Sequence, residues 1–81
     1  MIVEYTDELA RSIRIVRDGK VRLRIKKMVD KLIADPHYGR PLRYDLQGKR
    51  SLRLPPFRII YEIDGDRLVL HTFENRDMVY R

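Results

Sequence analysis

The hydrophobic pattern of this chain changes its period near residue 50. Between residues 9 and 33 apolar residues recur every three or four positions, and after residue 50 they alternate with polar ones. The first spacing is typical of one face of a helix, and the second of a half-buried strand. We therefore expect an α+β domain, β-α-α-β-β-β in order, with a helical hairpin packed on one face of an antiparallel sheet. A chain of 81 residues has no room for a second core, so a single domain covers residues 1–81.

The N-terminal half predicts one strand and two helices. The strand covers residues 2–5, and Thr6 is a suitable N-cap for the first helix, which we expect to end at Asp18-Gly19. The second helix runs from about residue 20 to 34 and stops before a proline. Residues 37–49 have no clear periodicity and read as a loop. Helices of this length joined by a short turn form a hairpin.

The C-terminal half predicts three strands, at residues 51–54, 57–63 and 67–73. Asp64-Gly65 is a strong signal for a two-residue hairpin turn, which would place Arg58 opposite His71. If the turn at Pro55-Pro56 is symmetric, Arg53 lies opposite Arg58. These three residues then form a row on the sheet face away from the helices. Facing guanidinium groups destabilise a sheet, so the row indicates an anion site.

The charge of the chain also indicates an anionic partner. It has 18 Lys and Arg against 12 Asp and Glu, a net charge of +6. Most of the basic residues are Arg, whose planar fork of donors suits phosphate. Between residues 39 and 58 the basic side chains greatly outnumber the acidic ones, and we expect phosphate contacts from Arg53, Arg50, Lys49 and Arg43. The alternative is an ordinary surface network, in which Glu62, Glu74 or Asp45 neutralises an arginine.

The composition excludes several classes of protein. Without Cys the chain can form neither disulfides nor thiolate metal sites, and we expect no metal ion and no cofactor. No apolar run approaches the roughly 20 residues that a membrane-spanning helix needs. The first residues also lack the basic start and apolar stretch of a secretory signal. We therefore expect a soluble, cytoplasmic protein that has no membrane partner.

Several short segments occur in an informative order. Leu46-Gln47-Gly48 precedes Leu52-Arg53-Leu54, and the strand Phe57-Arg58-Ile59-Ile60-Tyr61 follows. The last of them is Asn75-Arg76-Asp77-Met78-Val79-Tyr80. Together these segments resemble the RelE/ParE toxin superfamily of bacterial and archaeal toxin–antitoxin systems. The resemblance covers nearly the whole chain and implies a small curved sheet under a helical hairpin, and a cognate antitoxin protein as partner.

The RelE branch of this superfamily implies an endoribonuclease. Such a toxin enters the ribosomal A site, cuts mRNA without a metal ion and so inhibits translation. By position, Arg58 matches the arginine that stabilises the reacting phosphate, and Arg76 matches a late basic residue near the site. Tyr80 matches a tyrosine implicated in proton transfer or base stacking. His71 is the other candidate for the base, because imidazole changes its charge near neutral pH.

The ParE branch implies a different activity, the inhibition of DNA gyrase by binding rather than by catalysis. RelE carries two lysines where this chain has Ser51 and Arg53. No other acid–base group clearly replaces them, which is more typical of the ParE branch. The sequence therefore predicts a RelE-type mRNA nuclease, with a ParE-type gyrase inhibitor as the alternative.

Overall fold

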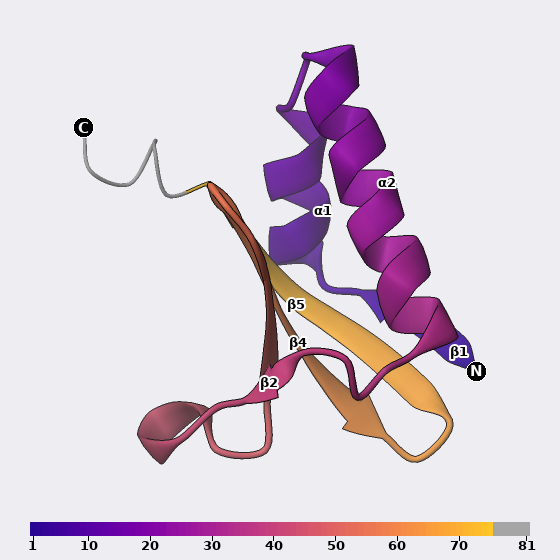
Figure 1. Cartoon of the computed structure of the whole chain (residues 1–81), viewed down its shortest axis with the longest axis vertical. Coiled ribbons are helices and arrows are strands. Elements are labelled where there is room, and N and C mark those ends of the chain that lie inside the picture. The colour runs from indigo at the N-terminus through magenta and orange to yellow at the C-terminus, as the bar shows by residue number, and fades with distance from the viewer. Residues whose placement is uncertain (76–81) are drawn as a thin grey trace.

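Two helices cover one face of a sheet in the computed structural model, which describes residues 1–75 (Figure 1). The elements are β1 (Ile2–Tyr5), α1 (Asp7–Arg14), α2 (Gly19–Ala34), β2 (Arg40–Pro41), the 3₁₀ turn η1 (Tyr44–Leu46), β3 (Arg50–Leu54), β4 (Phe57–Asp64) and β5 (Arg67–Asn75). The predicted α+β class is confirmed. None of the helices in the described residues is long and apolar enough to cross a membrane.

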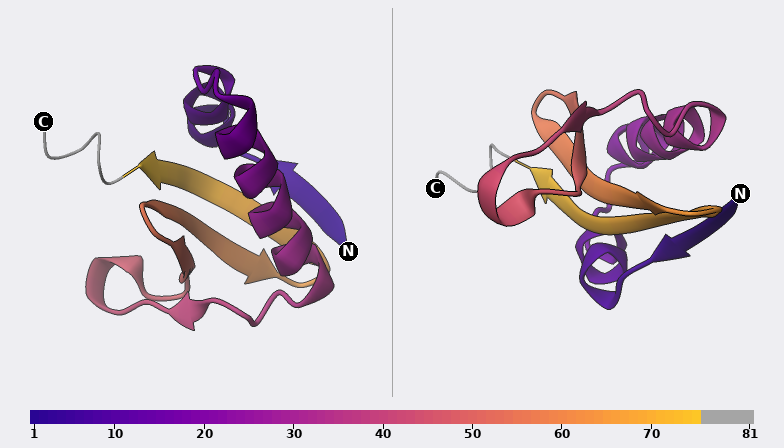
Figure 2. Two further views of the ribbon diagram at one scale, coloured as in Figure 1. Left: turned by 45° about the horizontal axis from the view of Figure 1, so that its top comes forward. Right: turned by 90° about the horizontal axis from the view of Figure 1, so that it is seen from below.

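The sheet has the strand order β1-β5-β4-β3-β2 within residues 1–75 (Figure 2). The pairs from β5 to β2 are antiparallel, as expected, but β1 runs parallel to β5. A parallel pair needs a long connection, and the helical hairpin supplies the first part of it by passing over the sheet. The sheet is therefore mixed rather than purely antiparallel.

The core lies between the helices and the sheet. Its buried members are Leu9 from α1, Ile25, Met28, Val29 and Leu32 from α2, and Leu52, Phe57, Ile59, Tyr61, Leu68, Leu70 and Phe73 from the strands. The α2 members recur every three or four residues, which places them on one stripe of the helix. Phe57 and Phe73 stack with ring centroids 5.5 Å apart, and the guanidinium of Arg24 lies 4.9 Å from the Phe57 ring centroid.

The helix caps confirm one prediction made from the sequence and correct another. Thr6 caps α1 as predicted, since its Oγ1 accepts a hydrogen bond from the Leu9 amide at 3.1 Å. The same hydroxyl donates to the carbonyl of His71 at 2.5 Å and ties the start of α1 to β5. Asp18 does not end α1. It caps α2 by accepting from the Lys20 amide at 2.8 Å, because a carboxylate suits the positive end of a helix.

The connection between α2 and β3 is also more ordered than predicted. Residues 37–49 contain the two-residue strand β2 and the 3₁₀ turn η1 instead of an unstructured loop. Arg40 pairs with Ser51, and Pro41 with Arg50, so β2 extends the sheet beyond β3. A two-residue strand is too short to show any periodicity, which explains why the sequence pattern did not indicate it.

The turn between β4 and β5 lies one residue later than predicted. Asp64 pairs with Arg67, so the turn residues are Gly65 and Asp66 rather than Asp64 and Gly65. Gly65 has φ +61°, a conformation that glycine adopts without a steric penalty. The shift allows Asp64 to form an ion pair with Arg67 at 3.2 Å.

A β-bulge in β5 changes the register a second time. Ile60 pairs with Thr72 but Tyr61 pairs with Leu70, so His71 is the extra residue of the bulge. Beyond the bulge Phe73 faces the core, whereas in a strand without the bulge it would lie on the opposite face, two residues from His71. Arg58 consequently lies opposite Glu74 and not opposite His71, which corrects the predicted three-residue row.

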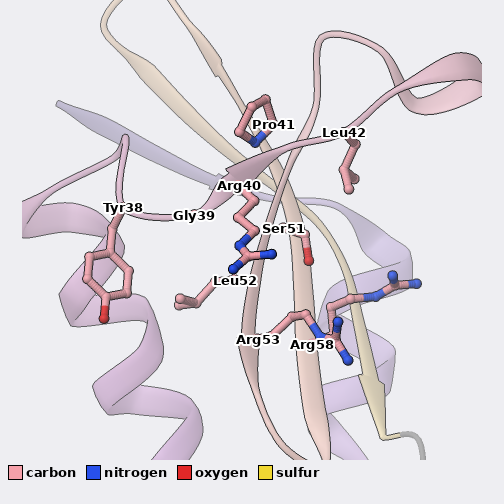
Figure 3. Close-up of a pocket in the computed structure, with 9 residues that line it drawn as sticks. All are labelled: Tyr38, Gly39, Arg40, Pro41, Leu42, Ser51, Leu52, Arg53 and Arg58. Carbon is pink, nitrogen blue, oxygen red and sulfur yellow. The ribbon is translucent and has the colours of Figure 1, made fainter.

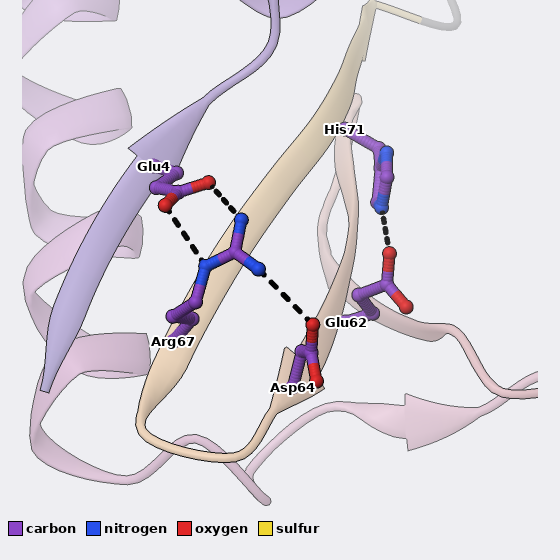
Figure 4. Close-up of polar contacts among 5 residues, drawn as sticks. All are labelled: Glu4, Glu62, Asp64, Arg67 and His71. Atoms are coloured by element: carbon purple, nitrogen blue, oxygen red, sulfur yellow. Dashed lines mark hydrogen bonds and ion pairs between the residues drawn. The ribbon is translucent and has the colours of Figure 1, made fainter.

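Ion pairs on the outer face join β5 to its two neighbours, β1 and β4 (Figure 4). Arg67 binds Glu4 through two hydrogen bonds, at 2.9 and 2.5 Å, and so connects β5 to β1. On the neighbouring strands His71 Nε2 lies 2.5 Å from Glu62 Oε1. The hydrogen bonds from Arg67 hold the pKa of the Glu4 carboxyl below its usual value, and Glu4 in turn raises the pKa of Arg67.

We predict that the Glu4–Arg67 pair makes stability depend on acid pH. Because the pKa of Glu4 is lowered in the folded state, the pair stabilises the fold above the unfolded pKa and is lost as Glu4 becomes protonated. The wild type should therefore lose more stability than Glu4→Gln between about pH 5 and pH 3. Urea denaturation at several pH values measures this, and parallel losses in both proteins would contradict the assignment.

Candidate functional site

An open hollow lies on the outer part of the sheet, where β2, β3 and β4 meet (Figure 3). Its volume is about 510 Å³, and it is lined by Tyr38, Gly39, Arg40, Pro41, Leu42, Ser51, Leu52, Arg53 and Arg58. Every charged side chain in this lining is an arginine. The hollow therefore offers hydrogen-bond donors and positive charge, which is the chemistry that binds phosphate.

The predicted pairing of Arg53 with Arg58 is confirmed. The two residues are direct partners across β3 and β4, and Leu52–Ile59 and Leu54–Phe57 flank them in the same register. Figure 3 shows both guanidinium groups on the side of the sheet that carries the hollow. Side chains on this face point away from the core formed by the helices.

The two arginines differ in their surroundings. Arg58 is held by Glu74 on β5, with Nε at 3.1 Å and Nη2 at 2.8 Å from the same carboxylate oxygen. Its side chain is only 25% exposed. Arg53 is exposed, and no carboxylate within residues 1–75 forms an ion pair with it. The alternative of a surface network thus applies to Arg58, whereas Arg53 is available to an anion.

A buried tyrosine fixes the wall of the hollow. Tyr61 is fully buried on β4, and its hydroxyl donates to the carbonyl of Pro36 at 2.6 Å while it accepts from the amide of Gly39 at 3.0 Å. A Cβ at position 39 would lie 2.5 Å from this hydroxyl and 2.7 Å from the carbonyl oxygen of Ser51. Only glycine allows the chain to pass this close to β3 and β4, and this passage places Arg40 over the hollow.

The predicted phosphate-binding residues outside the strand pair lie beside the hollow and do not line it. The guanidinium of Arg50 donates to the carbonyls of His37 and Gly39, at 2.9 and 2.6 Å, and thereby supports the same wall. Lys49 lines a smaller hollow together with Arg50. Arg43 is exposed at the start of η1.

The predicted catalytic residues are not all assembled in this hollow. Arg58 lines it, but His71 lies in the β5 bulge, where it contacts Glu62. Arg76 and Tyr80 lie outside the described residues. Among residues 1–75 the hollow is therefore lined by groups that can donate hydrogen bonds to an anion, and His71 is not part of its lining.

Arg40 and Ser51 are among the lining residues of the hollow that were not predicted as site residues. The sequence analysis counted Arg40 only among the basic residues of its segment. The close approach of Gly39 to Tyr61 is what places Arg40 in the lining of the hollow. Ser51 is buried on β3, and its hydroxyl has no hydrogen-bond partner among the described residues. No sequence signal distinguishes a serine of this kind from an ordinary strand residue.

The sequence was compared with known protein families and with curated proteins. A family described as "ParE toxin of type II toxin-antitoxin system, parDE" matches residues 3–80. Among curated proteins none matches the sequence. The family match spans both helices and every strand of the sheet.

The fold is similar to several solved structures. The toxin–antitoxin complex RelBE2 from Mycobacterium tuberculosis has a chain with a TM-score of 0.81 and 24% identity, covering 93% of this chain and 96% of that one. The intact E. coli RelBE complex gives 0.75 and 12%, with coverages of 91% and 94%. YafQ from E. coli gives 0.68 and 14%, with coverages of 98% and 97%. At these identities the likeness establishes the fold.

We predict that Tyr61→Phe destabilises the protein by about 1–3 kcal/mol, because it removes the partner of the part-buried Pro36 carbonyl and of the buried Gly39 amide. The amide resonance of Arg40 should shift in the NMR spectrum, since the wall loses its anchor. Tyr44→Phe is the matched control, because Tyr44 is 90% exposed and should tolerate the change. Equal urea midpoints for the two variants would contradict the anchoring role of Tyr61.

Proposed function

The chain belongs to the ParE toxin family of type II toxin–antitoxin systems, and from this premise we propose that it is a ribosome-dependent endoribonuclease that cuts mRNA without a metal ion. The observation that carries the proposal is the pairing of Arg53 with Arg58 at the edge of an arginine-lined hollow. Glu74 neutralises one of the two facing guanidinium groups, and a phosphodiester that binds Arg53 and competes with Glu74 for Arg58 would pair with both. The resemblance to the RelE branch supports mRNA as the substrate.

The proposed reaction is attack of a ribose 2′-oxygen on the adjacent phosphorus. The 2′-hydroxyl loses its proton to a base, the P–O5′ bond breaks, and the departing oxygen receives a proton, which leaves a 2′,3′-cyclic phosphate. Arg53 binds the phosphate, and Arg58 stabilises the charge that develops on it. Neither arginine can act as the base, because guanidinium does not deprotonate in proteins. His71 and Tyr80 remain the two candidates for that role.

A ParE-type inhibitor of DNA gyrase is the second candidate function. Two observations favour it: the matching family is named for ParE, and Arg58 and His71 are each bound to a carboxylate, Glu74 and Glu62. A protein that acts only by binding needs no free base. The two functions differ in target and in chemistry, so one pair of assays separates them.

We also propose a cognate antitoxin protein as the partner of this chain. RelBE2 and RelBE are described as toxin–antitoxin complexes, which supports a partner of the same kind here. The helical hairpin offers exposed apolar side chains, Ile15 just after α1 at 73% and Leu23 on α2 at 52% exposure. The net charge of +6 favours an acidic partner.

We predict that Arg58→Ala lowers the rate of mRNA cleavage by about 10²–10³-fold, because it removes a group that stabilises the transition state. Arg53→Ala should weaken substrate binding more than the rate at saturation. Primer extension on mRNA translated in a purified system measures both. Arg14→Ala, an exposed arginine on α1, is the control for charge alone. Intact mRNA, together with inhibited gyrase supercoiling, would replace the nuclease with the second candidate.

We further predict that Glu74→Gln strengthens binding of single-stranded RNA by about threefold to tenfold at low salt. In the wild type the RNA phosphate must displace the Glu74 carboxylate from Arg58, whereas in the variant that carboxylate is absent. Fluorescence anisotropy with a labelled oligonucleotide measures the affinity. Glu8→Gln on α1 makes the same change in net charge far from the hollow. If Glu74→Gln weakened binding instead, Glu74 would be a positioning residue for Arg58 rather than a competitor of the phosphate.

A further inference from the structure

A second, smaller hollow lies between α2 and β3, and we call it the α2–β3 hollow. It shares Tyr38, Leu52 and Arg53 with the arginine-lined hollow, and the rest of its lining consists of Lys27, Met28, Lys31 and Leu54. Its volume is about 190 Å³. Sites for free small molecules usually exceed roughly 300 Å³, whereas a peptide side chain needs less room. The size of this hollow therefore suits the side chain of a bound peptide.

The charged side chains of the α2–β3 hollow are all cations. Lys27 and Lys31 lie one turn apart on α2, a spacing at which like charges destabilise a helix. The ammonium of Lys31 lies 4.5 Å from the centroid of the Tyr38 ring. Within residues 1–75 neither lysine forms an ion pair, and neither does Arg53. Asp30, which lies between the two lysines in sequence, is bound to another lysine of α2 at 2.9 Å. The hollow is therefore complementary to the carboxylates of a partner.

The backbone of β3 is open at the same place. β2 pairs only with the first two residues of β3, so in the described part of the chain the rest of β3 has a neighbour only on the β4 side. The Leu42 amide donates to the Lys49 carbonyl at 2.9 Å, and backbone groups that point to one edge recur every second residue. Arg53, four residues after Lys49, therefore presents its amide and carbonyl to the open edge.

The course of the chain before β2 explains why this edge is free. Figure 3 shows that the chain turns away from β3 at Gly39 and carries Tyr38 toward the helix. Unpaired amide and carbonyl groups at the edge of a sheet are a template for a further strand. A hollow that accepts a side chain, a set of unpaired cations and an open strand edge thus occur together.

We propose that a short extended segment of a partner protein adds to the open edge of β3, with an acidic residue opposite Arg53 and an apolar residue on either side of it. In naming the antitoxin as this partner, the inference rests on the proposed function. A residue paired with Arg53 projects from the same face of the sheet, so its carboxylate binds the guanidinium. Its two neighbours turn toward α2 and the apolar floor of the hollow, which Met28, Leu52 and Leu54 form. Acidic residues further along the segment meet the two lysines of α2.

This segment gives Arg53 the kind of partner that Arg58 already has. Arg58 is bound to Glu74 of its own chain, and Arg53 lies directly opposite it on β3. With the segment in place, both guanidinium groups of the facing pair are neutralised by carboxylates. Arg53 is then no longer available to another anion, so the partner blocks the arginine-lined hollow directly.

The test is an NMR titration of the full chain with a short synthetic peptide in which leucine and glutamate alternate. We expect the amide resonance of Arg53 to shift and its hydrogen exchange to slow, because this amide becomes part of a strand ladder. The double variant Lys27→Gln, Lys31→Gln should bind the peptide about threefold to tenfold more weakly at low salt, because two ion pairs are lost. Lys20→Gln, Lys26→Gln is the matched control, since both lysines are exposed on α2 and neither lines the hollow.

A second peptide separates strand addition from simple charge attraction. It has the same composition, but its leucines and its glutamates stand in two blocks, so it cannot present them on alternate faces. This peptide should bind more weakly than the alternating one. Equal binding of the two peptides, or unchanged hydrogen exchange at Arg53, would refute the proposal. If the Lys27→Gln, Lys31→Gln variant lost affinity for a labelled RNA oligonucleotide but not for the peptide, the hollow would be a nucleic-acid surface instead.

The experiment distinguishes this inference from the proposed function because peptide binding needs neither ribosome nor antitoxin. Peptide that binds beside Arg53, on a protein that leaves translated mRNA intact, would refute the nuclease and retain the partner site. Where mRNA is cut, the peptide should inhibit cleavage, and cleavage unchanged at saturating peptide would refute the site and retain the nuclease. A cognate antitoxin that bound the Lys27→Gln, Lys31→Gln variant as tightly as the wild type would retain the antitoxin as partner and refute this site.

Discussion

The hydroxyl of Tyr61 is the contact on which the arrangement of the hollow depends. It lies in the interior at the centre of the sheet and satisfies one carbonyl and one amide of the segment that leads into β2. Because β2 has only two residues and forms few ladder hydrogen bonds, these two bonds are what anchor that segment to the interior. Arg50 reinforces the same segment from the edge of the sheet. A structural tyrosine and a structural arginine thus give Arg40 a fixed place beside Ser51 and Arg53.

The bulge at His71 has a comparable effect on the other side of the hollow. By adding one residue to β5, it moves Glu74 opposite Arg58 and turns the side chain of Phe73 into the core. With the same turn and no bulge, Phe73 rather than Glu74 would lie opposite Arg58. Of the two arginines on adjacent strands, Arg58 is therefore bound to Glu74, and Arg53 forms no ion pair within the described residues. This difference comes from backbone geometry rather than from residue type.

Local patterns predicted the parts of the fold that are set by neighbouring residues. The Thr6 cap, the period of α2 and the Arg53–Arg58 register follow from capping chemistry and from the apolar residues around Pro55-Pro56. The bulge, the strand β2 and the roles of Gly39 and Ser51 depend on contacts between distant segments, which no local pattern records. Asp18 shows an intermediate case, because an aspartate beside a glycine can either end one helix or begin the next.

The parallel pairing of β1 with β5 determines when this protein can complete its fold. Residues 2–5 are synthesised well before their partners in the sheet, residues 67–70. Until β5 has left the exit tunnel, the emerging chain exposes the unpaired edge of β1 and the apolar stripe of its helices. The sheet can therefore close only once residues 67–70 are available, and until then the nascent chain is open to capture by chaperones or proteases.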